Sequence, residues 1–213
     1  MKPVMDYTLY LVTDEALCSA PTLEEGVEQA LKGGATLVQL REKETNSRDV
    51  YEQALKVKAV CDRYQVPLII NDRLDIALAV DAAGVHLGQE DLPCAAAKKI
   101  LGEDKIIGVT AKTLSQALEA EKAGADYLGC GAMHLSTAKP GALPMSLDTL
   151  RSILGAVKIP VVAIGGINAE NAGEIVAAGV NGLAVVSAII AAPDIKKAAE
   201  ELKKIILRND ISG

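Results

Sequence analysis

Short apolar runs alternate with longer amphipathic segments along the whole chain. The short runs are rich in Val, Ile and Leu, which is typical of buried strands. The longer segments repeat apolar residues at helical spacing, which is typical of helices that pack one face on a core. The predicted strands are residues 9–13, 37–40, 68–70, 84–87, 106–109, 127–129, 161–164 and 182–186. The predicted helices are residues 22–31, 47–64, 74–80, 95–101, 114–122, 147–154, 169–177 and 195–207.

This regular alternation predicts parallel β-α-β units, and eight such units predict a closed barrel. We therefore expect one α/β domain over residues 1–213, folded as a (β/α)8 TIM barrel with its chemistry at the carboxyl ends of the strands. The open doubly wound sheet is the alternative, but it usually has fewer strands. Four glycines are expected to end helices and turn the chain into the next strand. They are Gly34, Gly84, Gly124 and Gly179.

Composition limits the kinds of partner. Half of the 213 residues are apolar, which is enough for one compact core. The chain has no Trp or Phe and only five Tyr, so little material exists for stacking on nucleic-acid bases. The formal net charge of -6 disfavours nucleic acid and anionic membranes as partners, and no apolar run approaches the ~20 residues of a membrane helix. A small anionic ligand in a local basic pocket is favoured.

The four cysteines, Cys18, Cys61, Cys94 and Cys130, are scattered without a CxxC pair. The N-terminus also lacks the apolar stretch of a signal peptide. These features predict a cytoplasmic, reduced protein in which each cysteine is a small, buried or half-buried hydrophobe. Exposed apolar helix faces would allow two copies to pair, but no feature fixes an interface, so a homo-oligomer stays open.

Basic side chains follow the second predicted strand. Gln39, Arg41 and Lys43 alternate with other residues, so an extended chain would send all three to one side. Two cations and an amide would then face one region at the mouth of the barrel, which suits an anionic ligand. The alternative interpretation is a solvated charged loop.

Acidic side chains follow the third and fourth predicted strands. Asp72 comes directly after Asn71, and Asp91 follows the next strand along the chain. Two carboxylates at neighbouring strand ends would repel each other unless a cation bridged them, and oxygen ligands beside phosphate favour Mg²⁺ over Zn²⁺. Asp72 as a helix N-cap is the alternative, and Glu90 could replace Asp91 as the ligand.

The last two predicted strands end in features of a phosphate site. Gly165 and Gly166 follow the seventh strand and would let backbone N–H groups approach an anion closely. Ser187 follows the eighth strand at the start of another apolar helical segment, where helix N–H groups and the helix dipole favour negative charge. Paired glycines are also ordinary in such turns, so their position on the last two strands strengthens the prediction.

Seven motifs, taken in order, carry a resemblance over nearly the whole chain. They are residues 9–14, 39–43, 71–73, 84–91, 129–133, 163–167 and 186–189. Each is weak alone, but together they resemble the thiamine phosphate synthase family, also called thiamine-phosphate pyrophosphorylase. The resemblance implies a Mg²⁺-dependent transferase that joins hydroxymethylpyrimidine diphosphate to a thiazole phosphate and releases pyrophosphate.

The resemblance also implies roles for individual residues. The pyrimidine diphosphate would be bound by Gln39, Leu40, Arg41, Glu42, Lys43, Asn71, Thr110 and Lys139. The thiazole phosphate would be bound by Ser136, Thr137, Ala138, Gly166, Val186 and Ser187. Asp72 and Asp91 would bind Mg²⁺, while Arg41, Lys43 and Lys139 would stabilise the charge on the departing pyrophosphate. Thr110 stands where the family usually has Ser, and its hydroxyl keeps the same contact available.

The loop after the sixth strand departs from the family pattern, since only Lys139 and Ala142 are unchanged between residues 134 and 142. Ala138 loses a hydroxyl, which Thr137 would replace if the loop shifted by one residue. The departure opens two alternatives: a thiazole tautomerase-like isomerase with His134 as its candidate base, and a non-catalytic barrel that binds a phosphate ligand. His134 as a packing residue in place of Phe is the simpler interpretation of that position. The sequence does not indicate which thiazole phosphate is preferred.

Overall fold

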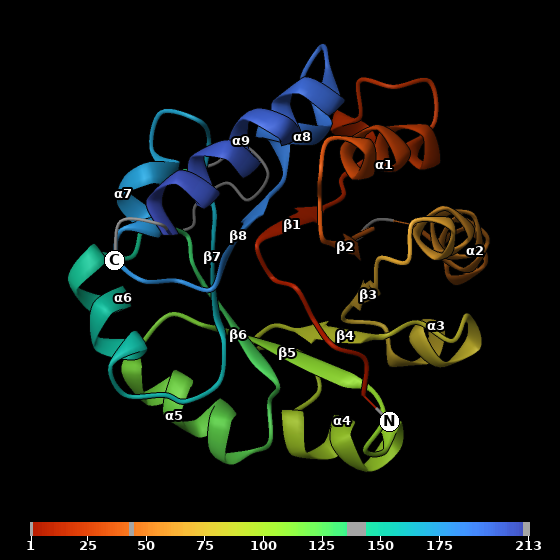
Figure 1. Ribbon diagram of the computed structural model, residues 1–213. Helices are drawn as coiled ribbons and strands as arrows, with labels where there is room; N and C mark the ends of the chain where they lie inside the picture. Colours follow the sequence, from red (N-terminus) through yellow and green to blue (C-terminus); the bar gives the residue numbers. More distant parts are fainter. Residues whose placement is uncertain (1, 43–44, 136–143, 211–213) are drawn as a thin grey trace.

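The computed structural model describes residues 2–42, 45–135 and 144–210. Eight parallel strands form a closed ring in the order β1 to β8, and β1 pairs with both β2 and β8. The helices surround this ring on its outer side (Figure 1). The predicted (β/α)8 barrel is therefore confirmed, and the open sheet is excluded because an open sheet would leave β1 and β8 unpaired with each other.

The elements follow the predicted ranges closely. The strands are β1 (Leu9–Val12), β2 (Leu37–Leu40), β3 (Leu68–Asn71), β4 (Gly84–Leu87), β5 (Ile106–Ala111), β6 (Tyr127–Gly131), β7 (Val161–Ile164) and β8 (Gly182–Val185). The helices are α1 (Leu23–Lys32), α2 (Ser47–Arg63), α3 (Leu74–Ala79), α4 (Cys94–Leu101), α5 (Leu114–Lys122), α6 (Leu147–Leu154), α7 (Ala172–Val176), α8 (Ser187–Ile190) and α9 (Ile195–Asp210), with a 3₁₀ turn η1 (Glu15–Leu17).

Some element boundaries differ from the predicted ones. Helix α7 starts three residues later than predicted, because the Asn168 side chain accepts the N–H groups of Glu170 and Asn171 in a turn of its own. Strands β5 and β6 each continue for two more residues, and Thr110 pairs there with Gly129. Helix α8 was expected only as a helix start near Ser187 and was not among the eight predicted helices.

The prediction for one of the four glycines is wrong. Gly34, Gly124 and Gly179 have positive φ angles of 99°, 90° and 95°, as expected for chain reversal after a helix. Gly84 instead lies inside β4, and Asp81 takes the left-handed conformation of that turn with φ 51°. A Cβ at Gly84 would lie 2.0 Å from Ile106 O, so this glycine allows β4 and β5 to approach closely.

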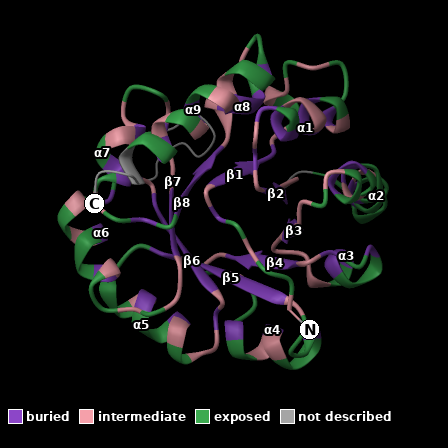
Figure 2. Cartoon of the chain, in the orientation of Figure 1, coloured by how far each residue is buried: buried purple, intermediate pink, exposed green. Residues whose placement is uncertain are grey.

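Buried residues occupy two layers. Aliphatic side chains fill the space between the strands and the surrounding helices, and the outward helix faces are exposed (Figure 2). A second cluster fills the inside of the ring and includes Tyr7, Tyr10 and Tyr127. The N-terminal segment closes the amino end of the barrel, since a Cβ at Gly182 would lie 1.7 Å from Tyr7 O. The opposite, carboxyl end of the barrel is therefore the candidate position for a site.

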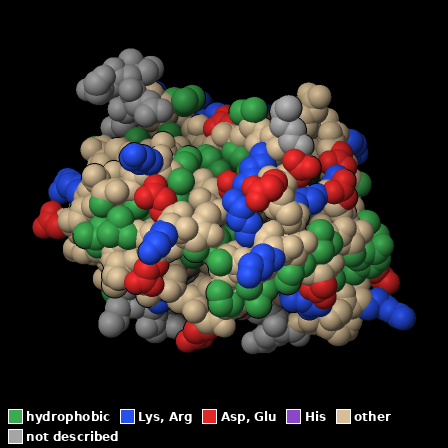
Figure 3. All heavy atoms as spheres, turned by 90° about the horizontal axis from the view of Figure 1, so that it is seen from below, with side chains coloured by type: hydrophobic (Ala, Val, Ile, Leu, Met, Phe, Trp, Pro, Cys, Tyr) green, Lys and Arg blue, Asp and Glu red, His purple; other side chains and the backbone are tan. Residues whose placement is uncertain are grey.

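The surface mixes charges of both signs with scattered apolar side chains. Figure 3 views the side that carries α4 and α5, where hydrophobic side chains lie among Lys, Arg, Asp and Glu. Leu92, Ile100, Leu114 and Leu118 are exposed on or beside these helices. Within the described ranges, no helix has both the length and the apolar character to cross a membrane. All four cysteines are free, and three are buried.

Gly84→Ala should destabilise the protein, because the added methyl meets backbone that cannot move aside. We expect a loss of about 1–3 kcal/mol or more in the free energy of unfolding, measured by urea denaturation. Gly155→Ala is the matched control, since a Cβ there would meet only ordinary contacts at 3.5 Å and Gly155 already has helical φ and ψ. Equal stability of the two variants would contradict the close approach of β4 and β5.

Candidate active site

Arg41 is held beside an acidic residue at the carboxyl ends of β1 and β2. Its backbone N–H donates to Thr13 Oγ1 over 3.1 Å, which keeps the chain after β2 against the end of β1. Its guanidinium Nη1 lies 3.9 Å from Asp14 Oδ2, with 22% and 21% of the two side chains exposed. Asp14 belongs to the motif of residues 9–14, which predicts no role for it. The structure indicates that Asp14 orients Arg41.

Alternation along β2 sends neighbouring side chains to opposite sides of the barrel wall. Gln39 is 3% exposed, and its Nε2 donates to Tyr10 OH inside the ring over 2.7 Å. Leu40 packs in the outer layer between strands and helices, so only its backbone is available to a ligand in the barrel mouth. Lys43 lies outside the described residues.

Glu42 lies on the outer side of the site beside η1. Its Oε1 is buried and has no hydrogen-bond partner within the described residues. Burial raises the pKa of Glu42 to about 7, with repulsion from Glu15 and Asp14 adding to the effect. This carboxyl is therefore partly protonated near neutral pH.

The two predicted metal-binding acids follow neighbouring strands. Asp72 N–H donates to His86 O over 2.9 Å, which ties the residue after β3 to β4. Asp72 has a left-handed backbone with φ 60°, and the N-cap of α3 is Arg73 rather than Asp72. Asp91 folds back toward the end of β4, where its Oδ2 accepts the Gly88 N–H over 2.6 Å, while Glu90 is exposed.

The donor set at these two strand ends fits Mg²⁺. Between residues 2 and 210, leaving out 43–44 and 136–143, no group of three or more His, Cys, Asp or Glu side chains is arranged to hold a metal. Zinc sites usually need three or four protein ligands, whereas Mg²⁺ is usually held by one or two carboxylates together with water and substrate phosphates. Two oxygen-bearing side chains at the barrel mouth match the second description.

A chain of hydrogen bonds runs from the mouth into the barrel interior. His86 Nε2 lies 2.9 Å from Thr110 Oγ1, and His86 Nδ1 lies 3.0 Å from Tyr127 OH. Tyr127 OH lies 2.8 Å from Tyr10 OH, which also accepts the Gln39 amide. Burial lowers the pKa of His86 to about 4, so its ring is neutral at physiological pH. Sequence reasoning assigned no role to either tyrosine or to His86, although a histidine within an apolar strand was a visible signal.

The ends of β7 and β8 and the start of the β6 loop lie together. Gly166 has φ 65°, and a Cβ there would lie 2.7 Å from His134 Cβ. Ser187 begins α8, and the first helical bonds go from Ile189 N and Ile190 N to Val186 O. The N–H groups that come before Ile189 in the chain therefore lie at the amino end of α8, where backbone donors lack intrahelical partners.

The loop that departs from the family pattern begins at His134, which is hydrogen-bonded to the turn after β7. His134 N–H donates to Gly165 O over 3.0 Å, and His134 Nε2 lies 3.5 Å from Glu174 Oε1 of α7. This contact on α7 does not single out His134 as a catalytic base. The predicted loop residues Ser136, Thr137, Ala138 and Lys139 lie outside the described residues.

Comparisons with known proteins agree with this geometry. A family model described as thiamine monophosphate synthase matches residues 9–189. Thiamine-phosphate synthase of Ruminiclostridium cellulolyticum is 58% identical over 97% of this chain and 99% of the relative, and that of Clostridium beijerinckii is 54% identical over 98% and 100%. The solved thiamine phosphate pyrophosphorylase of Pyrococcus furiosus superposes with a TM-score of 0.89 at 45% identity, covering 95% of this chain and 96% of that structure.

The fold and the arrangement of charged groups define a (β/α)8-barrel enzyme that acts on phosphorylated small molecules. Within that class, the chain belongs to the thiamine monophosphate synthase family. It has the thiamine-phosphate synthase activity of that family, a transfer that releases pyrophosphate. The tautomerase and the non-catalytic barrel are therefore set aside.

The raised pKa of Glu42 predicts a pH-dependent contribution to stability. The protonated carboxyl is favoured in the folded state, so its contribution is fully present below the unfolded pKa of 4.5 and is lost as the pH rises through about 7. Glu42→Gln should therefore gain stability relative to the parent protein between pH 4.5 and 7. Urea denaturation at several pH values measures this difference, with exposed Glu52→Gln of α2 as the control. A difference that does not change with pH would contradict the prediction.

Proposed function

We propose that the mouth formed by β2, β3, β4 and β5 binds the pyrimidine diphosphate, and that Asp72 and Asp91 bind the Mg²⁺ that accompanies it. The observation that carries the proposal is the fixed position of the two acids at neighbouring strand ends, one tied to His86 O and the other to Gly88 N–H. The side chain of Arg41 supplies positive charge near the mouth, and Asn71, Gln39 and Thr110 supply uncharged polar groups.

The metal would offset the negative charge of the diphosphate and of the departing pyrophosphate. The side chains of the protein then have two roles. Arg41, oriented by Asp14, stabilises charge on the leaving group together with Lys43 and Lys139, which belong to the family motif. Asn71 and Thr110 position the diphosphate. Leu40 contributes only backbone, since its side chain packs in the outer layer.

The reaction needs little general acid or base catalysis. A diphosphate leaves from a benzyl-like carbon, and the electron-rich aminopyrimidine supports the resulting positive charge. Positioning of the thiazole nitrogen against that carbon then supplies much of the rate enhancement. The neutral state of the buried His86 is consistent with this reaction, because no histidine needs to gain or lose a proton during the transfer.

We propose that the thiazole phosphate is bound on the opposite side of the mouth, by Gly166, Val186, Ser187 and the loop residues 136–138. Gly166 lies against His134, where that loop begins, so the loop and the phosphate-binding turn share one wall. The N–H groups at the start of α8 are suitable donors to a phosphate.

The four free cysteines support a cytoplasmic location.

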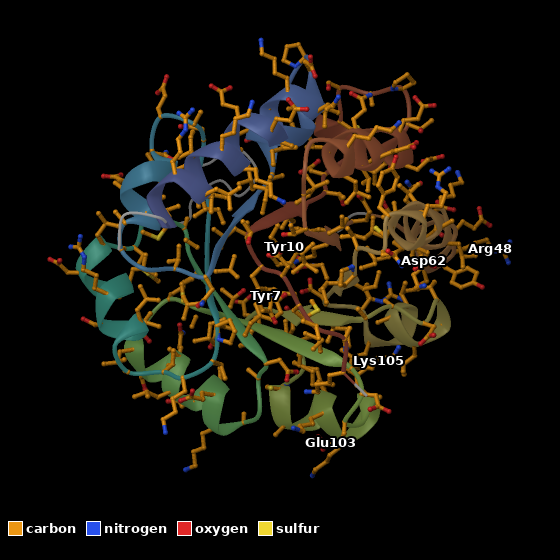
Figure 4. All side chains as sticks on the ribbon, viewed as in Figure 1. Tyr7, Tyr10, Arg48, Asp62, Glu103 and Lys105 are labelled. Atoms are coloured by element: carbon orange, nitrogen blue, oxygen red, sulfur yellow. The ribbon has the colours of Figure 1, made fainter. Side chains whose placement is uncertain are left out.

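Asp72→Asn should abolish most pyrophosphate release while leaving the fold intact. Asn tolerates the left-handed backbone at this position but lacks the charge that holds a divalent cation. We expect release from the two substrates to fall by roughly 100-fold and to require Mg²⁺ in the parent protein. Asp62→Asn is the matched control, since Asp62 pairs with Lys58 on α2, outside the ring of strands (Figure 4). Full activity of Asp72→Asn at low Mg²⁺ would remove Asp72 from the proposed site.

Thr137→Ala tests the shifted loop. If Thr137 supplies the hydroxyl that Ala138 lacks, its loss should raise KM for the thiazole phosphate roughly three- to tenfold, the effect of one hydrogen bond to a charged group. KM for the pyrimidine diphosphate should stay unchanged. Ser136→Ala is the paired variant, measured with both substrates. An effect confined to Ser136→Ala would show that the loop keeps the register of the family.

A further inference from the structure

The hydrogen-bond chain inside the barrel links the proposed diphosphate site to side chains buried within the ring of strands. Tyr10 and Tyr127 are 1% and 0% exposed, and Gln39 and His86 are also buried. Thr110, in contrast, is half-buried at the mouth. Four hydrogen bonds join the five side chains in the order Gln39, Tyr10, Tyr127, His86 and Thr110.

Glycines on two strands make room for this chain. A Cβ at Gly108 would lie 2.1 Å from Tyr127 Cζ, and a Cβ at Gly129 would lie 2.9 Å from His86 Cε1. Both rings therefore occupy space that any other residue at these two positions would fill. The main chain of Thr110 is held as well, because Gln89 Nε2 donates to Thr110 O. The rings and the strand that carries Thr110 are fixed before any substrate binds.

The direction of the hydrogen bonds follows from counting donors. Burial raises the pKa of both tyrosine hydroxyls well above the usual value, so each keeps one hydrogen to donate. Tyr10 OH accepts the Gln39 N–H and lies beside Tyr127 OH, so its hydrogen is donated to Tyr127. Tyr127 must then donate to His86 Nδ1, which has to be unprotonated to accept.

This direction determines what Thr110 offers to a ligand. Because the donor count leaves Nδ1 as an acceptor without hydrogen, the ring carries its hydrogen on Nε2, which donates to Thr110 Oγ1. The Thr110 hydroxyl then keeps its own hydrogen for a group in the mouth. In the reverse direction Thr110 would donate to His86 and present only lone pairs to an anion, and the hydrogen of Tyr10 would lose its acceptor in the chain.

We propose that His86 and Tyr127 are positioning residues for the synthase reaction: through the Nε2–H form of His86 they hold Thr110 as a hydrogen-bond donor toward the diphosphate. The inference rests on the proposed function, in which Thr110 contacts the diphosphate. Neither residue touches substrate. Their effect reaches the reaction only through the orientation of one hydroxyl hydrogen, and it should appear in diphosphate binding rather than in thiazole phosphate binding.

The first test is spectroscopic and uses the unmodified protein. The chain has only two histidines, so nitrogen NMR of histidine-labelled protein gives two ring systems, and His134→Gln assigns them. We expect His86 to be neutral, with hydrogen on Nε2 and none on Nδ1. Hydrogen on Nδ1, or rapid exchange between the two forms, would overturn the proposal. This measurement requires no variant within the hydrogen-bond chain.

The second test is a double-mutant cycle on the binding of inorganic pyrophosphate with Mg²⁺. Thr110→Val should weaken binding about tenfold and Tyr127→Phe roughly three- to tenfold, while Thr110→Ser should restore binding to within about twofold. Tyr127→Phe should have no further effect in the Thr110→Val background, because it acts through Thr110. Additive losses would mean that Tyr127 acts on the barrel as a whole and would overturn the proposal.

Tyr7→Phe is the matched control for the cycle. The Tyr7 ring packs against the Tyr127 ring at a centroid distance of 4.9 Å, but its hydroxyl is not one of the links between Gln39 and Thr110. Figure 4 shows Tyr7 and Tyr10 within the ring of strands. We expect Tyr7→Phe to change neither the His86 spectrum nor pyrophosphate binding. Absence of pyrophosphate binding by the parent protein would overturn the proposed site as well, whereas normal binding with an Nδ1–H His86 would overturn this inference alone.

Discussion

The pairing of β1 with β8 is the constraint on which the whole site depends. All eight strands run in the same direction, so their carboxyl ends point to one side, but only closure brings the first and last of them together. In an open sheet, Asp14 and Arg41 would lie near one edge and Ser187 near the other. Closure makes these groups neighbours across a single mouth. Two phosphorylated substrates can then meet over one ring of strand ends.

The inside of the ring holds two large polar side chains, Tyr127 and His86, and their packing bears on how the proposed site binds its ligand. Tyr127 and His86 are too large to share the interior with ordinary side chains, and glycines on β5 and β6 leave them space. Each ring brings a polar group into the buried interior, so each needs a hydrogen-bond partner there. The result is a polar floor beneath the mouth, surrounded by an aliphatic outer layer.

Most of the fold could be predicted from the sequence, because strand and helix patterns are local. Boundaries moved where a side chain competed with the backbone, as Asn168 does before α7, and where Asp81 rather than Gly84 took the left-handed turn. The interior hydrogen bonds could not be predicted, because their partners are 117 and 41 residues apart in the chain. A single polar residue in an apolar strand does not indicate, from the local sequence, which strand carries its hydrogen-bond partner.

The candidate site also has features that the sequence predicts and features that it does not. Motif order predicts Arg41, Asp72 and Asp91 as site residues, and each of them follows the carboxyl end of a strand in the closed barrel. The link from Asp14 to Arg41 depends on how the chain after β2 packs against the end of β1. That packing leaves no pattern in the sequence. Loop residues 136–139 remain predictions from the family motif.

The lack of tryptophan gives the tyrosines another property. Tyrosine is the main intrinsic fluorophore of this chain, and three of its five tyrosines lie in the cluster inside the ring of strands. Two of these, Tyr10 and Tyr127, are hydrogen-bonded directly to each other. Most of the tyrosines that can emit in the unlabelled protein therefore lie inside the ring of strands. The protein therefore carries intrinsic optical probes inside its own barrel.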